Sequence, residues 1–379
     1  MSLISYITQI HFGYGSVDKL QDECDRLSIK RPLIVTDAGV RLAGIVDVIL
    51  QKLNNPTNIG VFDKTPPNPN EHVIRDAVQV YRAGKHDGII AVGGGSSIDL
   101  AKGVAVCSQH DGPLRSFALI EDGASRITAA TAPVIAVPTT AGTGSEVGRG
   151  AILILDDGRK VGIISPHVVP KSAICDPALT VKLPPMLTAA TGMDAIAHCI
   201  ETFLSPSFNP PADGIALDGL RRGWANIEQA THDGNDLNAR LNMMSASMQG
   251  ALAFQKGLGC VHSLSHSLGG INPQLHHGTL NAIFLPAVVE FNRTASTVIQ
   301  EDKLSRLAQA MAIDGANAVI PALEQMIKRL GLPTGLKQLG VTESQFEKII
   351  DGALADHSHK TNPREASRDD YSKMLASSI

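Results

Sequence analysis

Residues 87–106 read DGIIAVGGGSSIDLAKGVAV, and this stretch decides the fold. Its apolar start predicts a buried strand, its three glycines a tight turn, and the residues after them a helix. Glycine lets the backbone approach a ligand closely, and a helix N-terminus attracts anions, so this turn suits a pyrophosphate. The glycine spacing differs from the dinucleotide fingerprint GxGxxG, and a plain strand-to-helix turn remains the alternative interpretation.

Strand-like and helix-like segments alternate on both sides of this stretch. The sequence predicts further strands at 32–37, 58–63, 133–138 and 172–180, and helices at 40–53 and 71–84. Two apolar runs flank Asp157 and Gly158 within residues 151–164, which predicts an inserted β-hairpin. Strands that alternate with helices indicate parallel βαβ units joined by right-handed crossovers.

The pattern changes after Pro185, where long helical patterns replace the strand-like runs. A loop at 205–214 is expected between two of these helices. We therefore predict an α/β, Rossmann-like nucleotide-binding domain over residues 1–184, followed by an all-α domain over residues 185–379.

Composition narrows the possible function classes. The 379 residues carry a net charge of −4 and no prominent run of Lys or Arg, so we expect no nucleic-acid partner. No apolar stretch approaches the roughly 20 residues of a membrane span, and residues 1–13 lack the basic and apolar segments of a leader. Five cysteines at scattered positions argue against a disulfide framework. We therefore expect a cytoplasmic protein with no membrane partner.

Polar residues gather where the predicted strands end. Asp37 closes one strand, where a carboxylate can accept hydrogen bonds from ribose hydroxyls and repel a 2′-phosphate, which favours NAD over NADP. A helix N-cap is the alternative role for Asp37. Asp99 is expected in the first turn of the helix after the glycines, where it would stabilise the helix end. The loop PTTAGTGSE (138–146) presents hydroxyls and glycines at the end of another strand, with a capped turn as the alternative.

The second half concentrates histidines in one stretch, CVHSLSHSLGGINPQLHHG (260–278). His262 and His266 are spaced i, i+4 and would share one helix face, as would Asp194 and His198 in the segment TGMDAIAHCIETF. Three imidazoles and one carboxylate from these segments would suit Fe²⁺ or Zn²⁺. For either segment alone, a pair of satisfied helix residues without a metal is the alternative interpretation.

These segments, in this order, make the chain resemble the iron-containing (group III) alcohol dehydrogenases nearly end to end. The shared motifs are GGGSSIDLAKG (93–103), PTTAGTGSEV (138–147), GMDAIAHCIE (192–201), GLGCVHSLSH (257–266), HHGTLNAIFLP (276–286) and TNPR (361–364). The resemblance implies a nucleotide-binding α/β domain, a helical domain and an active site in the cleft between them.

The resemblance also implies a role for individual residues. The metal ligands would be Asp194, His198, His262 and His277. His277 is preferred to His276 because the family's ligand directly precedes a glycine, here Gly278. We assign the nucleotide site to Asp37, Gly94, Gly95, Ser96, Asp99, Thr139, Thr140, Ser145 and Lys160. His266 would relay the proton.

The implied reaction is the reversible oxidation of a primary alcohol to an aldehyde with NAD, in which the metal acts as a Lewis acid. Fe²⁺ is the expected metal, and Zn²⁺ would also fit. Segments 209–220, 253–266 and 356–367 resemble members that act on 4-hydroxybutyrate, so 4-hydroxybutyrate and succinic semialdehyde are the expected pair. A general short-chain alcohol or diol dehydrogenase is the alternative. An inactive nucleotide-binding homologue is disfavoured because all four ligand positions are filled.

A hydroxy acid of four carbons carries a carboxylate remote from the reacting carbon, and burying that charge requires a cation or several donors. Arg149 is the first candidate, because a guanidinium can bind a carboxylate through two parallel hydrogen bonds. Lys256 is the second candidate, and pairing of Arg149 with Glu146 is the alternative. The resemblance further implies a homo-oligomer.

Overall fold

The computed structural model describes residues 4, 6–54 and 58–379. The expectation that residues 1–13 hold no leader therefore falls partly outside the described residues. The chain forms two compact units. The α/β unit comprises residues 6–140 and 145–183, and the helical unit comprises residues 141–144 and 184–379.

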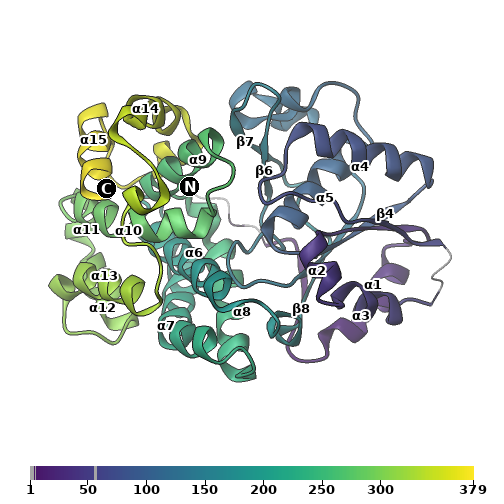
Figure 1. Ribbon diagram of the computed structural model, residues 1–379, viewed down its shortest axis with the longest axis horizontal. Coiled ribbons are helices and arrows are strands. Elements are labelled where there is room, and N and C mark those ends of the chain that lie inside the picture. Colours follow the sequence, from purple (N-terminus) through teal and green to yellow (C-terminus); the bar gives the residue numbers. More distant parts are fainter. Residues whose placement is uncertain (1–3, 5, 55–57) are drawn as a thin grey trace. The chain divides into compact units, whose positions relative to one another are not determined.

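The α/β unit is built on a parallel six-stranded sheet with the order β1-β8-β5-β4-β2-β3 (Figure 1). Its strands are β1 (Gln9–Phe12), β2 (Pro32–Val35), β3 (Gly60–Phe62), β4 (Gly88–Gly93), β5 (Val134–Pro138) and β8 (Ser172–Cys175). Ile90 of β4 pairs with Ile34 of β2 and with Ile135 of β5. The predicted Rossmann-like sheet is thus confirmed, and the predicted hairpin is present as β6 (Gly150–Ile154) and β7 (Lys160–Ile164).

Helices cover both faces of this sheet (Figure 1). They are α1 (Leu20–Arg26), α2 (Ala38–Leu42), α3 (Ile45–Gln51), α4 (Glu71–Ala83) and α5 (Gly95–Cys107). Successive residues of a strand point to opposite faces. Leu33 of β2 therefore joins the core beneath α4 and α5, and its neighbour Ile34 joins the core beneath α1 and α3. Burial on both faces explains why these strands read as continuous apolar runs.

Three segments of the α/β unit differ from the sequence predictions. β1 was not among the predicted strands, because its four residues are only partly buried at the edge of the sheet and form no apolar run. The helix predicted over 40–53 is two helices, α2 and α3, separated at Gly44, whose φ of 75° is left-handed. The strand predicted over 172–180 stops at Cys175, because Pro177 begins a 3-10 turn.

The helical unit contains helices and 3-10 turns throughout its described residues, as predicted for an all-α domain. Its helices are α6 (Pro185–Leu204), α7 (Pro210–His232), α8 (Leu237–Leu252), α9 (Cys260–Ile271), α10 (His277–Asn292), α11 (Ser296–Gln300), α12 (Lys303–Ala310), α13 (Val319–Arg329), α14 (Phe346–Ala355) and α15 (Arg368–Ser377). α7 begins inside the predicted loop 205–214, because proline suits the first helical turn and Asn209 caps it by accepting from Ala212 N–H at 3.3 Å.

α6 is buried along most of its length and packs against α7, α8 and α10. Glycines on the neighbouring helices permit this close approach. A Cβ added to Gly250 of α8 would lie 2.9 Å from His198 Cβ, and one added to Gly219 of α7 would lie 2.8 Å from Cys199 Sγ. Both distances are shorter than a real Cβ tolerates, so the glycines let α7 and α8 fix the backbone of α6.

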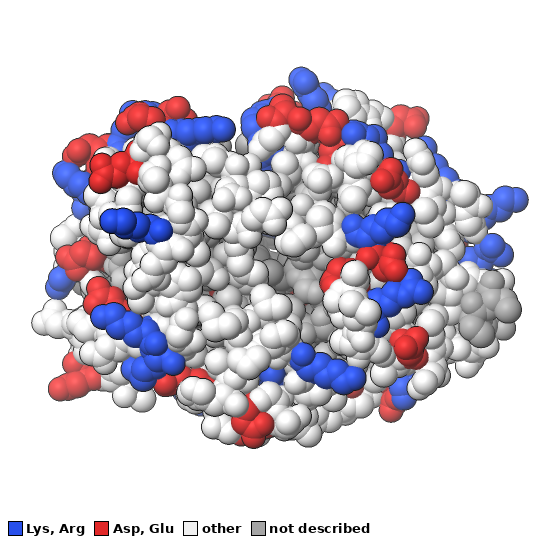
Figure 2. Space-filling model, viewed as in Figure 1, with Lys and Arg blue, Asp and Glu red and all other residues white. Residues whose placement is uncertain are grey.

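The surface and the helices also bear on possible partners. On the face in Figure 2, acidic and basic side chains are interspersed, in keeping with the small net charge of −4. In the part of the chain that the structure describes, no helix is both long and apolar enough to cross a membrane.

Candidate metal centre and nucleotide-binding loop

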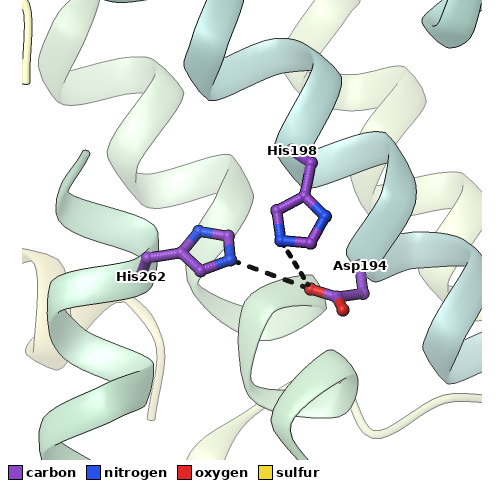
Figure 3. A group of neighbouring side chains, drawn as sticks. All are labelled: Asp194, His198 and His262. Carbon is purple, nitrogen blue, oxygen red and sulfur yellow. Dashed lines mark ion pairs between the residues drawn. The ribbon is translucent and has the colours of Figure 1, made fainter. Parts of the chain in front are cut away.

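Three helices of the helical unit carry the predicted metal ligands. Asp194 and His198 lie one turn apart on α6, His262 lies in the first turn of α9, and His277 is the first residue of α10. We call these four residues the Asp194 cluster. Figure 3 shows that the polar atoms of Asp194, His198 and His262 are turned toward one another.

The spacing in the Asp194 cluster fits a metal ion. Asp194 Oδ1 lies 3.5 Å from His198 Nε2, 3.8 Å from His262 Nε2 and 3.8 Å from His277 Nε2. These separations are too long for good hydrogen bonds. They are close to the ~3.4 Å expected between ligand atoms in a tetrahedral site with bonds of about 2.1 Å. Ligand atoms of Asp194, His198 and His262 all lie within 4.8 Å of one another.

Burial keeps the candidate imidazoles in the form that binds metals. Desolvation lowers the pKa of His198 to about 4 and that of His262 to about 3, although the nearby Asp194 carboxylate opposes both shifts. Both rings are therefore neutral at neutral pH. Neutral imidazole has a free lone pair, which is what coordination of a divalent metal requires.

The structure distinguishes His277 from its neighbour His276. His277 opens α10 with its side chain 22% exposed and its Nε2 toward Asp194, whereas His276 is the exposed N-cap residue. The following Gly278 packs directly on α6, since an added Cβ would lie 2.2 Å from the Ala190 carbonyl oxygen. Glycine therefore lets the start of α10 reach α6, and this brings His277 rather than His276 to the cluster.

Asn281 lies beside the cluster and was not singled out from the sequence. It is fully buried, and its Nδ2 donates to Asp194 Oδ1 at 2.7 Å. The same nitrogen lies 3.1 Å from His262 Nε2 and 3.1 Å from His277 Nε2. Asn281 follows His277 by one helical turn on α10, and this i, i+4 spacing is the signal that could have found it.

Glu201 is a second neighbour that the sequence analysis missed. It lies on α6 and is buried, and its two carboxylate oxygens meet the start of α9. One oxygen contacts His262 Nδ1, and the other accepts from Val261 N–H at 2.9 Å. Its spacing of three residues from His198 and seven from Asp194 places all three side chains on one helix face, which is a recognisable sequence signal.

His266 belongs to a different group of residues. Its Nδ1 donates to Asp356 Oδ2 at 3.0 Å, and His357 Nδ1 lies 3.7 Å from the same oxygen. We call His266, Asp356 and His357 the Asp356 cluster. Burial would raise the pKa of Asp356, but the charge and hydrogen bond of His266 hold this pKa below its usual range. The His266 ring also stacks on His277, with ring centroids 5.3 Å apart.

The predicted pyrophosphate turn lies at the start of α5. Asp37 caps α2 and Asn70 caps α4, but no side chain among the described residues caps α5. Its N-cap is Gly94, where an added Cβ would lie 3.2 Å from the Thr140 side chain, and the preceding Gly93 has a φ of 150°. Uncapped N–H groups and an approachable glycine backbone suit a phosphate.

Other predicted nucleotide contacts hold the loops around this turn. Thr139 N–H donates at 3.0 Å to the carbonyl of the first glycine of the turn. Ser96 Oγ donates to the Pro67 carbonyl, and Lys160 Nζ donates to Asn68 Oδ1 at 2.9 Å. These contacts order the segments that a nucleotide would approach.

Asp37 occupies the helix-capping position proposed as its alternative role. One carboxylate oxygen accepts from Val40 N–H at 3.0 Å, and the other accepts from Ser97 Oγ at 3.2 Å. This places the carboxylate at the carboxyl end of β2, next to the glycine turn. A ribose contact for Asp37 stays a prediction.

The prediction that Asp99 lies in the first turn of α5 is wrong. α5 begins at Gly95, so Asp99 falls in the second turn and cannot serve the helix end. Its carboxylate instead accepts from Ser145 Oγ at 2.5 Å and from Ile152 N–H at 3.0 Å. Lys102 Nζ also donates to Ser145 Oγ at 2.7 Å, so this network ties α5 to the loop after β5 and to β6.

The two side chains proposed to bind the substrate carboxylate differ in whether they already have partners within the protein. Arg149 is exposed, and among the described residues its guanidinium makes no ion pair with the buried Glu146. Lys256 is buried, donates to the Phe203 carbonyl at 3.2 Å and pairs with Asp213. Burial also lowers the pKa of Lys256. These internal partners argue against Lys256 as a substrate ligand and leave Arg149 as the better candidate.

Comparisons with known proteins agree with this architecture. The model of the iron-containing alcohol dehydrogenase family matches residues 8–177, and the model of that family's C-terminal region matches residues 188–379. The 4-hydroxybutyrate dehydrogenase of Cupriavidus necator is 60% identical to this chain, with 100% of both chains covered. The chain therefore belongs to the iron-containing alcohol dehydrogenase family, which confirms the resemblance seen in its motifs.

Solved structures show the same fold. A crystal structure of 1,3-propanediol oxidoreductase has a TM-score of 0.92 and 34% identity, with 100% of both chains covered. Sulfoacetaldehyde reductase from Bifidobacterium kashiwanohense, in complex with NAD+, has a TM-score of 0.88 and 26% identity over 100% of this chain and 98% of that one.

Proposed function

We propose that this chain is a metal-dependent dehydrogenase that interconverts 4-hydroxybutyrate and succinic semialdehyde with NAD(H). The observation that carries the proposal is the convergence of three imidazole nitrogens on one oxygen of the buried Asp194 carboxylate, the fourth candidate ligand. The substrate follows from 60% identity over the full length to a 4-hydroxybutyrate dehydrogenase. We assign nucleotide binding to residues 1–184 and metal binding to residues 185–379.

In this proposal Asp194, His198, His262 and His277 hold a divalent metal. Fe²⁺ is the expected ion, and Zn²⁺ suits the same nitrogen and oxygen donors. A metal bound there would supply Lewis acidity toward the alcohol oxygen and lower its pKa. Neutral His198 and His262 bind without competing protons at neutral pH, and Asp194 contributes negative charge that offsets part of the ion's charge.

NAD(H) would supply the hydride acceptor or donor, and the α/β unit provides the groups that bind it. The uncapped N-terminus of α5, with Gly94, Gly95 and Ser96, would hold the pyrophosphate. Asp37 would accept from the ribose hydroxyls and disfavour a 2′-phosphate. Thr139, Thr140 and Lys160 lie on neighbouring segments and complete the proposed site.

His266 is the proposed proton relay. Its Nδ1 is held by Asp356, so its Nε2 remains the nitrogen that can take up or deliver a proton. Arg149 is proposed to bind the carboxylate at the far end of the substrate, since its guanidinium is exposed and makes no ion pair within the described part of the chain.

The cellular setting and assembly are also proposals. All five cysteines are free, which suits a reducing cytoplasm. A homo-oligomer is inferred from membership of the family. Light scattering coupled to size-exclusion chromatography tests it, and a monomer at micromolar concentration would contradict it.

Activity assays on matched aldehydes test the proposed function. The rate of NADH oxidation with succinic semialdehyde should exceed the rate with butanal at least several-fold. Butanal has the same chain length but lacks the carboxylate. Treatment with a chelator should remove the activity, and Fe²⁺ should restore it. Equal rates on both aldehydes would favour a general short-chain alcohol or diol dehydrogenase, in line with 36% identity to the 1,3-propanediol dehydrogenase of Klebsiella pneumoniae.

A further inference from the structure

Glu201 is a buried carboxylate with no assigned role in the proposed reaction. It lies on the face of α6 that carries Asp194 and His198, and it is 3% exposed. A charged group is costly to bury unless it is hydrogen-bonded and its charge is compensated. Its partners therefore indicate what the carboxylate does.

Both oxygens of Glu201 are engaged by the first turn of α9. Oε2 accepts from His262 Nδ1 in a short contact, and Oε1 accepts from Val261 N–H at 2.9 Å. Gly259 precedes this turn, and an added Cβ there would lie 3.1 Å from Glu201 Oε1. The chain thus brings α9 close to the carboxylate, which fixes the ring of His262 from its outer side.

The contacts of the two ring nitrogens indicate the tautomer of His262. An amide NH₂ group donates only, and Asn281 Nδ2 lies 3.1 Å from His262 Nε2, so Nε2 accepts and the proton of the neutral ring sits on Nδ1, where Glu201 Oε2 accepts it. Nε2, which faces Asp194 Oδ1 at 3.8 Å, is then the nitrogen with the free lone pair. His198 uses the same arrangement with a different partner, because its Nδ1 donates to the Gly142 carbonyl at 3.2 Å.

We propose that Glu201 is a positioning residue of the metal centre, which holds the ring of His262 by accepting from its Nδ1 and so keeps Nε2 free to bind a metal. The inference rests on the metal role proposed for the Asp194 cluster. It does not depend on the substrate or on NAD.

The substitution Glu201→Gln tests this role with little change in shape. Glutamine has one acceptor oxygen, so it cannot accept from both His262 Nδ1 and Val261 N–H. If its amide NH₂ faces His262, the imidazole proton moves to Nε2 and blocks coordination. We expect the affinity for Co²⁺ to fall about tenfold to a hundredfold, measured by the visible absorption of the metal during titration of metal-free protein.

Glu23→Gln is the matched control. Glu23 is also 3% exposed and pairs with a histidine, His11, at 3.0 Å, but it lies in the α/β unit. This control should bind Co²⁺ within about twofold of the wild type. Co²⁺ affinity of Glu201→Gln equal to that of the wild type would overturn the proposal, and so would an equal loss in both variants.

A measurement on the wild type covers the case in which Glu201→Gln does not fold. Imidazole nitrogen NMR of the metal-free protein, assigned with His262→Gln, should show the proton of His262 on Nδ1. A proton on Nε2 would overturn the proposal. If succinic semialdehyde is not a substrate but these results hold, the proposed substrate fails and the role of Glu201 stands.

Discussion

The Asp194 cluster and the Asp356 cluster are built from the same two residue types, yet their spacing differs. In the Asp194 cluster three imidazole nitrogens stand 3.5 to 3.8 Å from one carboxylate oxygen. In the Asp356 cluster His266 lies at 3.0 Å, an ordinary hydrogen-bond distance, and His357 lies at 3.7 Å. At its longer spacing Asp194 is too far from all three imidazoles for a good hydrogen bond, as ligands around an ion would be, whereas Asp356 is hydrogen-bonded to His266.

Burial does not separate the two clusters. Each has one partly exposed histidine, His277 at 22% and His357 at 25%, and desolvation lowers the pKa of His198, His262 and His357 alike. What distinguishes the Asp356 cluster is that, against the effect of burial, the charge and hydrogen bond of His266 hold the pKa of Asp356 below its usual range. Residue type alone therefore does not define a metal site, since distance and charge state decide between coordination and proton transfer.

The largest expected effect is that of Asp194→Ala. This variant should lose most of its bound metal and more than about a thousandfold in kcat/KM, because the Lewis acid contributes several kcal/mol to the reaction. Elemental analysis and NADH-linked assays measure both. His276→Ala is the control and should keep its metal. A loss of metal in His276→Ala but not in His277→Ala would reverse the choice between these two histidines.

A smaller loss is expected for Asp356→Asn. Without the carboxylate, His266 loses the group that orients it, and kcat should fall about a hundredfold, as is typical of an impaired proton transfer. The metal content should stay at the wild-type level. If Asp356→Asn loses metal as well as activity, the two clusters form one site and the contrast between them fails.

Arg149→Met should change neither cluster. We expect kcat/KM for succinic semialdehyde to fall about thirty- to a hundredfold, which corresponds to about 2–3 kcal/mol for a charge-assisted carboxylate contact. The value for butanal should stay within about twofold, since butanal has no carboxylate. Parallel losses on both aldehydes would mean that Arg149 supports its loop rather than the substrate.

The smallest effect concerns stability and pH. Because the folded-state pKa of His198 is lowered to about 4, its stabilising contribution is present above the unfolded-state pKa and is lost as the pH falls. Metal-free protein should therefore lose about 0.7 kcal/mol through His198 between pH 7 and pH 6. Asp356 contributes nothing in this range, since its pKa is held below its usual value. Urea unfolding of the wild type and His198→Gln at both pH values measures the difference, and identical pH dependence would contradict it.

Much of the fold could be predicted because its signals are local. The strand–glycine–helix stretch around Gly94 and the hairpin at Asp157 each contain residues that are typical of a turn. Both features are present in the structure. β1 could not be predicted, because a short edge strand is defined by its pairing with β8 rather than by its own residues. The break at Gly44 depends on a left-handed backbone conformation, which a helical periodicity does not reveal.

The candidate site was predictable where its residues repeat at helical spacing. Asp194 and His198 share a turn of α6, and the structure brings His262 and His277 to them. Glu201 and Asn281 were missed although they follow the same spacing, because the closest partner of each, His262 and Asp194 respectively, lies on another helix. Tertiary packing determines which polar residue hydrogen-bonds the outer side of a metal-binding residue. Local periodicity cannot specify this.

Anomalous X-ray diffraction from crystals of the metal-loaded protein tests the central contrast most directly. Data collected on both sides of the iron or zinc absorption edge reveal every bound metal ion by its anomalous peak. We expect one strong peak within about 2.3 Å of Asp194 Oδ1 and the Nε2 atoms of His198, His262 and His277, and no peak at the Asp356 cluster. A peak at the Asp356 cluster, or none at the Asp194 cluster, would contradict it.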